Sequence, residues 1–285
     1  MREKGISGFL RVVSLVAPLI FLVILIHVIL ESLPAATQIG TLLFDTSGAW
    51  RPLSHPPAFS ILPMVLGTLS VASFAVAIST PIGLLCTIFL HTYANRRLRD
   101  ILLSFIDLLA GIPSVIYGFI GVTIVVQNLE WIFNMTAGES ILAAALVLSV
   151  MLLPYIISGY SESIEIAKAK YSTVSMTLGV SEEYAIRKLI IPTTRKSAAA
   201  SIMAAFGRAM GETMAVMMVI GNAPIFPRLL GRGQTIPALT ALEVGSAAYG
   251  SLHLSAIYAA NLVTLLLLGL VLGITYLIRR RVLNQ

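Results

Sequence analysis

Long runs of apolar residues, separated by short polar stretches, extend along most of the chain. Six runs reach the length of about 20 residues that a helix needs to cross the hydrocarbon core of a bilayer. They lie at residues 12–30, 61–90, 101–126, 141–160, 198–220 and 254–278. They lack the polar–apolar alternation of membrane β-barrel strands, and a backbone in lipid must satisfy its own hydrogen bonds. The pattern therefore predicts an all-α, polytopic membrane protein with six transmembrane helices.

Composition supports a membrane protein and excludes several other classes. Hydrophobic residues make up 57% of the 285 residues and charged residues 11%, with a mean hydropathy of +0.92, whereas soluble domains carry roughly 25% charged residues. The single cysteine, Cys86, permits no internal disulfide. The four histidines are scattered without ligand spacing, so no metal site is predicted. No GxxxxGK[ST] stretch and no nucleophile elbow occurs, so we do not expect an enzyme that hydrolyses ATP itself.

The first apolar run follows Arg2, Lys4 and Arg11, as the core of a secretory signal would. Its apolar part is longer than the 7–15 residues of a signal core. We therefore expect a membrane anchor rather than a cleaved signal. Residues 1–60 then form an N-terminal anchor helix with the first outer loop, and residues 61–285 form the transmembrane core.

The distribution of basic residues predicts the orientation. With the N-terminus in the cytoplasm and six crossings, fifteen of the nineteen Lys and Arg residues lie inside. Arg51, Arg228 and Arg232 lie outside, and Arg208 lies within the membrane. An excess of Lys and Arg in the short inner loops is the usual pattern of membrane proteins. We expect both termini to be cytoplasmic, and the net charge of +6 needs no nucleic-acid partner to explain it.

The longest inner segment, residues 161–197, predicts a cytoplasmic helical hairpin. Two short amphipathic helices fit this segment, with Gly179 ending the first, where a left-handed residue is favoured. Ser181 can cap the second helix, and Glu182 and Glu183 lie in its first turn, as the helix dipole favours. Pro192 is expected to end that helix. The hairpin either joins two spans without further role or provides a platform for a cytoplasmic partner.

Arg208 and Glu212 interrupt the fifth apolar run in the stretch GRAMGET. Arg208 is roughly at the bilayer midplane, about eleven residues into the run at 1.5 Å per residue. A cation there costs about 2.5–3.5 kcal/mol, so it should face protein or water. Their i,i+4 spacing places both residues on one helix face. They form either an internal ion pair that holds the packing or a charged site on a translocation path, where the donor fork of Arg suits oxyanions.

The stretch GIPSVIYG, residues 111–118, interrupts the third apolar run. Pro113 removes a backbone hydrogen bond from the helix, and Gly111 and Gly118 allow neighbouring helices to approach closely. The interruption is either a packing kink or a gate that lines a pathway. In the second case Ser114 and Tyr117 offer hydroxyl groups to whatever passes.

The hairpin and three other stretches resemble a known family. Permease subunits of ABC importers carry Glu-Ala-Ala, three residues, Gly, nine residues and Ile-x-Leu-Pro in this loop. Here the positions hold Thr-Val-Ser at 173–175, Gly179 and Leu-Ile-Ile-Pro at 189–192, so the opening triplet departs. The stretches ILPMVLGTL, GIPSVIYG and GRAMGETMAVMMVIGN narrow the resemblance to permeases of phosphate importers, more to the PstC type than to the PstA type. The resemblance covers residues 60–278 and implies a MetI-like ABC-importer permease architecture.

The resemblance also implies a role, a location and partners. The chain would be a permease in the bacterial or archaeal cytoplasmic membrane, moving inorganic phosphate inward by alternating access past Arg208 and Glu212. Its partners would be a second permease subunit (a sibling or an identical chain), two cytoplasmic ATPase subunits that use the ATP, an extracytoplasmic phosphate-binding protein, and membrane lipid. No cofactor would be bound by this chain. The contacts with the ATPase would be made by Thr173, Ser175, Leu178, Gly179, Ser181, Glu182 and Pro192.

Two other functions remain open from the residues alone. One is a permease for another oxyanion, or an ion-coupled transporter that works alone. The other is a membrane sensor or assembly subunit that does not transport. Ion-coupled carriers more often have two broken spans in matching positions, whereas the sequence indicates one. A sensor would not need an arginine at the bilayer midplane.

Overall fold

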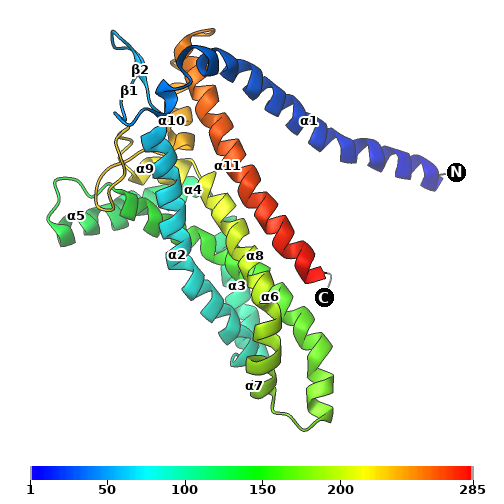
Figure 1. Ribbon diagram of the computed structural model, residues 1–285. Coiled ribbons are helices and arrows are strands. Elements are labelled where there is room, and N and C mark those ends of the chain that lie inside the picture. The colour runs from blue at the N-terminus through cyan, green and yellow to red at the C-terminus, as the bar shows by residue number, and fades with distance from the viewer. Residues whose placement is uncertain (1, 284–285) are drawn as a thin grey trace.

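The computed structural model describes the backbone of residues 2–283 and the side chains of residues 13–171, 175, 177–181, 183–278 and 280. Helices dominate the described chain, which confirms the all-α prediction (Figure 1). The long helices are α1 (Arg2–Ile39), α2 (Leu62–Thr92), α6 (Ile141–Thr177), α8 (Ile191–Met210) and α11 (Leu252–Leu283). The shorter ones are α3 (Arg96–Gly111), α4 (Ser114–Ile120), α5 (Gln127–Phe133), α7 (Glu182–Ala185), α9 (Met214–Val219) and α10 (Ile236–Glu243).

Helix α6 forms the centre of the bundle and packs against α2 and α8. Its segment Ile141–Tyr171 is the most buried of the helices long enough to cross a membrane. Ala143, Ala144 and Ala145 are fully buried there, and small residues let helices in a membrane approach closely. Gly159 lies so near Ser201 of α8 that an added Cβ would be 2.8 Å from the Ser201 hydroxyl. The core is therefore built around one helix with small residues on its contact faces.

Five helices, rather than six, are long and apolar enough to cross a membrane in the part of the chain that the structure describes. They are Val13–Ile39, Leu62–Thr92, Ser114–Phe133, Ile141–Tyr171 and Leu252–Ile278. Four of the six predicted runs are thus long helices close to their expected places. The predicted third and fifth spans are interrupted, and each interruption has a local cause.

The predicted span at 101–126 is wrong in its bounds because the chain breaks before Pro113. Helix α3 ends at Gly111, and Ile112 and Pro113 have extended ψ values of 128° and 140°. A proline disfavours the helical conformation of the residue before it. Helix α3 is a separate amphipathic helix whose first turn is capped by the Asn95 side chain, which accepts a hydrogen bond from the Leu98 N–H (2.8 Å). The membrane-crossing segment instead runs through α4, a short π-helix η2 (Gly121–Val126) and α5.

The predicted span at 198–220 is divided into α8 and α9 at residues 211–213. The Gly211 N–H donates to the Arg208 carbonyl (3.2 Å) and the Glu212 N–H to the Ala209 carbonyl (3.3 Å). These bonds reach back three residues instead of four, which tightens and ends a helix. Glycine also has a low helix propensity. The motif GRAMGET therefore marks a break between two helices, not the middle of one.

The helical hairpin predicted at residues 161–197 differs from the prediction in two respects. Its first arm is the continuation of α6, which runs unbroken to Thr177, so no separate helix begins after the fourth span. Pro192 does not end the second helix: it lies in the first turn of α8. The π-helix η3 (Ile186–Ile190) immediately before it changes the hydrogen-bond register, so the missing N–H of the proline is tolerated.

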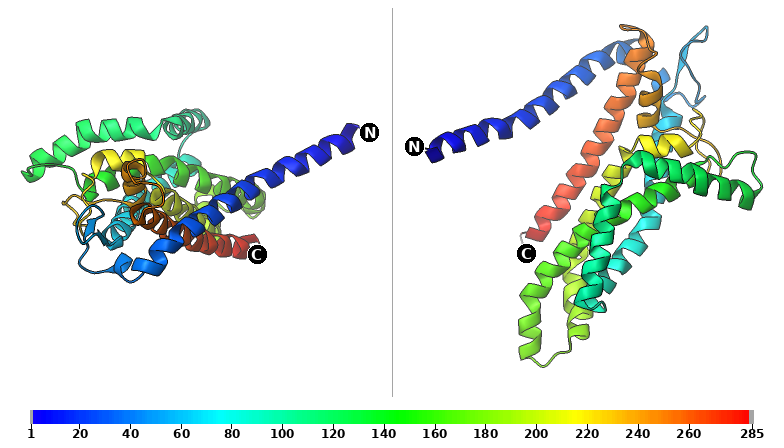
Figure 2. Two further views of the ribbon diagram at one scale, coloured as in Figure 1. Left: turned by 90° about the horizontal axis from the view of Figure 1, so that it is seen from above. Right: turned by 180° about the vertical axis from the view of Figure 1, so that it is seen from behind.

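The opposite end of the bundle carries the longer loops and a small hairpin. Strand β1 (Trp50–Arg51) pairs antiparallel with β2 (Ala58–Phe59), with Trp50 opposite Phe59. A 3₁₀ turn η1 (Leu42–Phe44) connects it to α1. The second half of α1 packs against α11, whereas its N-terminal half extends away from the other helices (Figures 1 and 2). Helix α7 and the hairpin turn lie at the far end from β1, β2 and α10.

Candidate functional site

Arg208 lies in the last turn of α8, at mid-depth of the bundle. A Cβ added to its neighbour Gly207 would be 3.2 Å from Leu268, which is near the middle of the apolar segment Leu252–Ile278 of α11. The Arg208 guanidinium lies over the ring of Tyr155, which is near the middle of the apolar segment Ile141–Tyr171 of α6. Both neighbours place the cation at the depth that the sequence suggests.

The partner of Arg208 in the structure is an aromatic ring. The guanidinium carbon is 4.2 Å from the centre of the Tyr155 ring, well within the range of a cation–π contact. Glu212 forms no ion pair with Arg208 among the described residues; one of its oxygens instead accepts a 3.5 Å hydrogen bond from the Ala215 N–H. The internal ion pair, one of the two alternatives that the sequence left open, is not formed in the described chain because the i,i+4 geometry needs a continuous helix, and α8 ends between the two residues.

The exposure of Arg208 has a chemical consequence. Its side chain is exposed on the surface of this single chain, and a cation facing lipid at mid-depth costs about 2.5–3.5 kcal/mol. The side chain therefore requires water or another protein chain on that face. A planar fork of donors held against an aromatic ring in such a place can bind an oxyanion.

The two interrupted segments pack against each other, α4 against α9. A Cβ added to Gly118 of α4 would be 2.6 Å from the Met218 sulfur and 3.1 Å from the Ala215 Cα of α9. The close approach expected at Gly118 is thus present. The sequence indicated one broken span, and the described chain has two. The number of broken spans therefore does not speak against an ion-coupled carrier.

The remaining residues of GIPSVIYG have different surroundings. Gly111 has no atom within 4 Å of a would-be Cβ, so the close approach expected there is not made within the described chain. The Tyr117 hydroxyl donates to the Leu109 carbonyl (2.9 Å), from α4 back to α3, and thereby braces the break at Pro113. Ser114 is half-buried in the first turn of α4. The Tyr117 hydroxyl is thus engaged in a hydrogen bond within the chain. Of the two hydroxyl groups predicted to face a pathway, the Ser114 hydroxyl is the one with no hydrogen bond given among the described residues.

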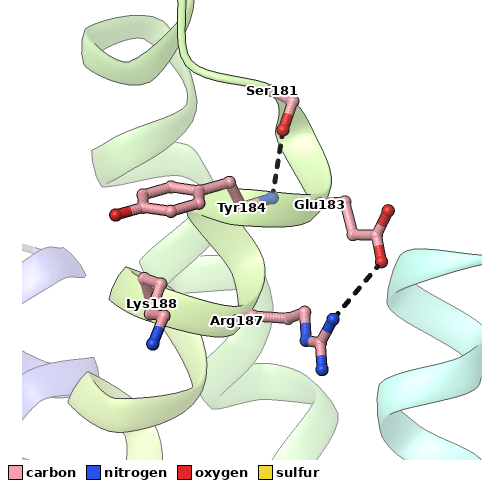
Figure 3. A pocket seen from close by; sticks show the side chains of 5 residues that line it. All are labelled: Ser181, Glu183, Tyr184, Arg187 and Lys188. Carbon is pink, nitrogen blue, oxygen red and sulfur yellow. Dashed lines mark hydrogen bonds and ion pairs between the residues drawn. The ribbon is translucent and has the colours of Figure 1, made fainter.

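The turn of the helical hairpin at residues 161–197 has the local geometry that the sequence predicts. Gly179 has a left-handed φ of +68°. The Ser181 hydroxyl accepts a hydrogen bond from the Tyr184 N–H (3.3 Å) and caps α7 (Figure 3). The Ser175 hydroxyl donates to the Tyr171 carbonyl (2.8 Å), and its carbonyl accepts the Val180 N–H (3.0 Å), closing the end of α6. The side chains of Thr173 and Glu182, two of the predicted contacts, lie outside the described part.

The outer surface of this turn is suited to a protein contact. Leu178 is 72% exposed and Tyr184 is 56% exposed. An open cavity of about 650 Å³ is lined by Ser181, Glu183, Tyr184, Arg187 and Lys188. Within it Arg187 forms a 3.8 Å ion pair with Glu183 (Figure 3). These exposed apolar side chains lie beside charged ones in the turn and in the short helix α7 that follows it, and such a mixed surface is suited to contact with another protein.

Tyr155 is the residue of the candidate site that sequence reasoning missed. It lies in the apolar fourth run directly after Pro154, and an isolated tyrosine in such a run is usually a packing residue. Only the fold brings it beneath the Arg208 guanidinium.

Comparison with known proteins identifies the family. Residues 79–284 match the family described as "Binding-protein-dependent transport system inner membrane component". The chain belongs to this family. This permease is 30% identical to the "Probable phosphate transport system permease protein PstC" of Methanocaldococcus jannaschii, covering 99% of this chain and 98% of that one. It is 33% identical to the "Probable ABC transporter permease protein YqgH" of Bacillus subtilis, covering 84% and 78%.

Solved structures support the fold assignment of the permease. A structure of the MetNI methionine ABC transporter in an inward-facing conformation matches 76% of this chain and 93% of that one, with a TM-score of 0.58 and 17% sequence identity. An amino acid ABC transporter solved with histidines matches with a TM-score of 0.56 and 16% identity. The family and the relatives make the permease an inner-membrane component of an ABC transporter, which works with other components, and the solved structures show that its fold is the MetI-like architecture.

Proposed function

We propose that the permease moves inorganic phosphate into the cytoplasm in an ATP-driven importer. The relatives named as phosphate permeases support the substrate, since one of them aligns over 99% of this chain. The observation that carries the proposal is the position of Arg208, a cation at mid-depth, at a helix break, over Tyr155 and without a carboxylate partner among the described residues. A phosphate that passes this point finds a planar donor fork not already engaged by a carboxylate.

The orientation and the partners follow from the same proposal. The hairpin and both termini face the cytoplasm, because this places fifteen of the nineteen basic residues inside. Two ATPase subunits bind the turn around Gly179 and hydrolyse the ATP, and this chain binds no cofactor. A second permease subunit covers the exposed face of Arg208 and shares the pathway. A phosphate-binding protein delivers the substrate to the outer loops, and the bundle moves phosphate past Arg208 by alternating access.

The test is phosphate uptake by variants of Arg208. Uptake of radiolabelled phosphate is measured at limiting concentration, in cells without other phosphate transporters, and is normalised to membrane-inserted protein. Arg208→Gln should abolish uptake, and Arg208→Lys should keep part of it, because lysine retains the charge without the fork. The matched control is Arg228→Gln, which removes an exposed arginine from an outer loop. Wild-type uptake by a well-inserted Arg208→Gln variant would show that Arg208 has no role in transport.

Competition between anions tests the substrate separately. Unlabelled phosphate should displace the radiolabelled phosphate, and sulfate at the same concentration should not. If sulfate or another oxyanion competes better, the importer serves that anion and the assignment of phosphate is wrong. If the purified complex takes up phosphate without ATP and follows an ion gradient, the chain is an ion-coupled transporter instead.

A further inference from the structure

An open cavity of about 580 Å³ lies beside the start of α6, at the opposite end of this helix from the hairpin turn. Thr136, Ala137 and Glu139 line it from the loop between α5 and α6, and Arg232 lines it from the loop between α9 and α10. The Arg232 guanidinium forms a 3.0 Å ion pair with Glu139. The two loops are far apart in the sequence, and we call the cavity that these four residues line the outer cavity.

The outer cavity is attached to α6 and α9, the two helices that flank the candidate site. The Gly231 carbonyl accepts a hydrogen bond from the N–H of Ile141 in the first turn of α6 (3.1 Å). The stem of Arg232 lies against Gly221, two residues after α9, since a Cβ added to Gly221 would be 2.6 Å from the Arg232 Cγ. Helix α9 has six residues, is therefore about 9 Å long, and begins just after the break that follows Arg208. The cavity thus lies one short helix from Arg208.

The polar groups that remain available in the outer cavity are donors. The Glu139 carboxylate is engaged by Arg232, whereas the side chain of Arg232 is 51% exposed and a guanidinium has five N–H donors and no acceptor. The Thr136 hydroxyl and the backbone N–H groups of Thr136 and Ala137 donate no hydrogen bond to another described residue. The described part of the chain contains no group of three His, Cys, Asp or Glu residues that could hold a metal ion. The cavity therefore suits an oxyanion rather than a cation.

The ion pair between Arg232 and Glu139 can be exchanged for another anion. The two side chains are 51% and 38% exposed, and ion pairs between groups this exposed contribute little to stability because water screens them. A phosphate ion presents two oxygens to the edge of a guanidinium, as a carboxylate does. The cation therefore keeps a partner when phosphate replaces Glu139.

We propose that the outer cavity binds a phosphate ion on Arg232, with Glu139 as the counter-ion that the phosphate displaces. This inference rests on the proposed function, which makes phosphate the substrate and places this end of α6 outside the cell. The ion then has two binding sites one short helix apart, Arg232 first and Arg208 second. Several weak sites in a row let an ion enter without being trapped.

The experiment measures phosphate binding at the outer cavity apart from transport. The complete importer is purified in nanodiscs and studied without ATP and without the binding protein. This chain carries Cys86→Ser, which removes its single cysteine, and Met135→Cys, which places a thiol in the cavity wall. The rate of maleimide modification of that thiol is measured against the concentration of inorganic phosphate, with chloride keeping the ionic strength constant. Phosphate should slow the modification, and the half-protecting concentration reports its binding.

Two further substitutions should shift this concentration in opposite directions. Arg232→Gln should raise it about 10-fold, a loss of about 1.4 kcal/mol of binding. Glu139→Gln should lower it about 3-fold, because the competing carboxylate of an exposed ion pair is gone. If the ion pair only holds the two loops together, both substitutions break the same contact. They would then change the modification rate in the same direction with and without phosphate, which would overturn the proposal.

The matched control is Arg228→Gln, which removes an exposed arginine of the same loop that does not line the cavity. It should stay within about twofold of wild type, because salt screens a charge outside the cavity. An effect as large as that of Arg232→Gln would mean that general surface charge attracts the anion, and the proposed site would be wrong. Protection by sulfate at lower concentration than by phosphate would overturn the assignment of phosphate to this cavity.

Uptake of radiolabelled phosphate separates the two proposals. In the importer with its binding protein, Arg232→Gln should lower the maximal rate of uptake at equal membrane insertion. If wild type takes up phosphate but phosphate gives no protection in the outer cavity, only this site is wrong. If wild type takes up no phosphate, the proposed function fails, whatever the cavity binds.

Discussion

Replacing Tyr155 tests whether the ring beneath Arg208 positions the cation for transport. The guanidinium carbon is 4.2 Å from the ring centre, and Tyr155 is 37% exposed in the single chain. A cation–π contact contributes about 0.5–1 kcal/mol at exposed sites and about 2 kcal/mol when water is excluded. At 1.4 kcal/mol per factor of ten, Tyr155→Leu should lower uptake about 2-fold to about 30-fold. A partner subunit that covers this face would move the loss toward the larger value.

The matched variant is Tyr155→Phe, which keeps the ring and loses only the hydroxyl. It should retain nearly wild-type uptake, because the ring face attracts the guanidinium. Uptake is measured at limiting phosphate and normalised to inserted protein, as for Arg208. If uptake by Tyr155→Phe is as low as uptake by Tyr155→Leu, the Tyr155 hydroxyl rather than the ring is required for transport. If the Tyr155→Leu variant takes up phosphate like wild type, the contact with the ring has no part in positioning Arg208.

Three further predictions concern the hairpin turn at Gly179, a close helix contact at Gly67 and the break at Pro113. Gly179→Val should uncouple transport from ATP hydrolysis while Gly179→Asn stays largely active, because asparagine tolerates the observed φ of +68°; equal activity of the two in a proteoliposome assay would contradict this. Gly67→Ala should destabilise the bundle, since its Cβ would be 2.2 Å from the Gln234 carbonyl oxygen, whereas Gly269→Ala has open space and should leave the melting temperature of the purified complex nearly unchanged. Tyr117→Phe removes the hydrogen bond across the Pro113 break and should cost about 1 kcal/mol of stability, measured by thermal unfolding; a larger loss of uptake than of stability would instead support a pathway role for the hydroxyl.

The long helices could be predicted from the sequence because their cause is local. Apolar length alone locates the helices around residues 12–30, 61–90, 141–160 and 254–278. The turn at Gly179 and the cap at Ser181 could also be predicted, since each depends on the conformation of a few neighbouring residues. For these four runs the predicted bounds failed at the ends, because a polar segment can continue the helix beyond the apolar run, as it does in α6.

The site was less predictable because it depends on contacts between distant segments. The pair Arg208 and Glu212 was expected from a helical spacing, but the Gly211 break removes the geometry that the spacing assumes. Tyr155 lies 53 positions from Arg208 in the sequence, and no local pattern connects them. Pro192 shows the opposite error: a proline that ends most helices is accommodated here by the π-helix before it.

The unbroken course of α6 has a mechanical consequence. At 1.5 Å per residue, a helix of 37 residues is about 55 Å long, and one end is the turn on which the ATPase subunits are proposed to bind. Such a helix acts as a lever: tilting it by about 5° would displace its ends by about 5 Å relative to each other, given that length. Pro154 is the one proline inside this lever and is the residue before Tyr155. Bending of α6 would therefore be concentrated next to the ring that lies against the Arg208 guanidinium, and a movement of the hairpin turn would reach the cation through one continuous helix.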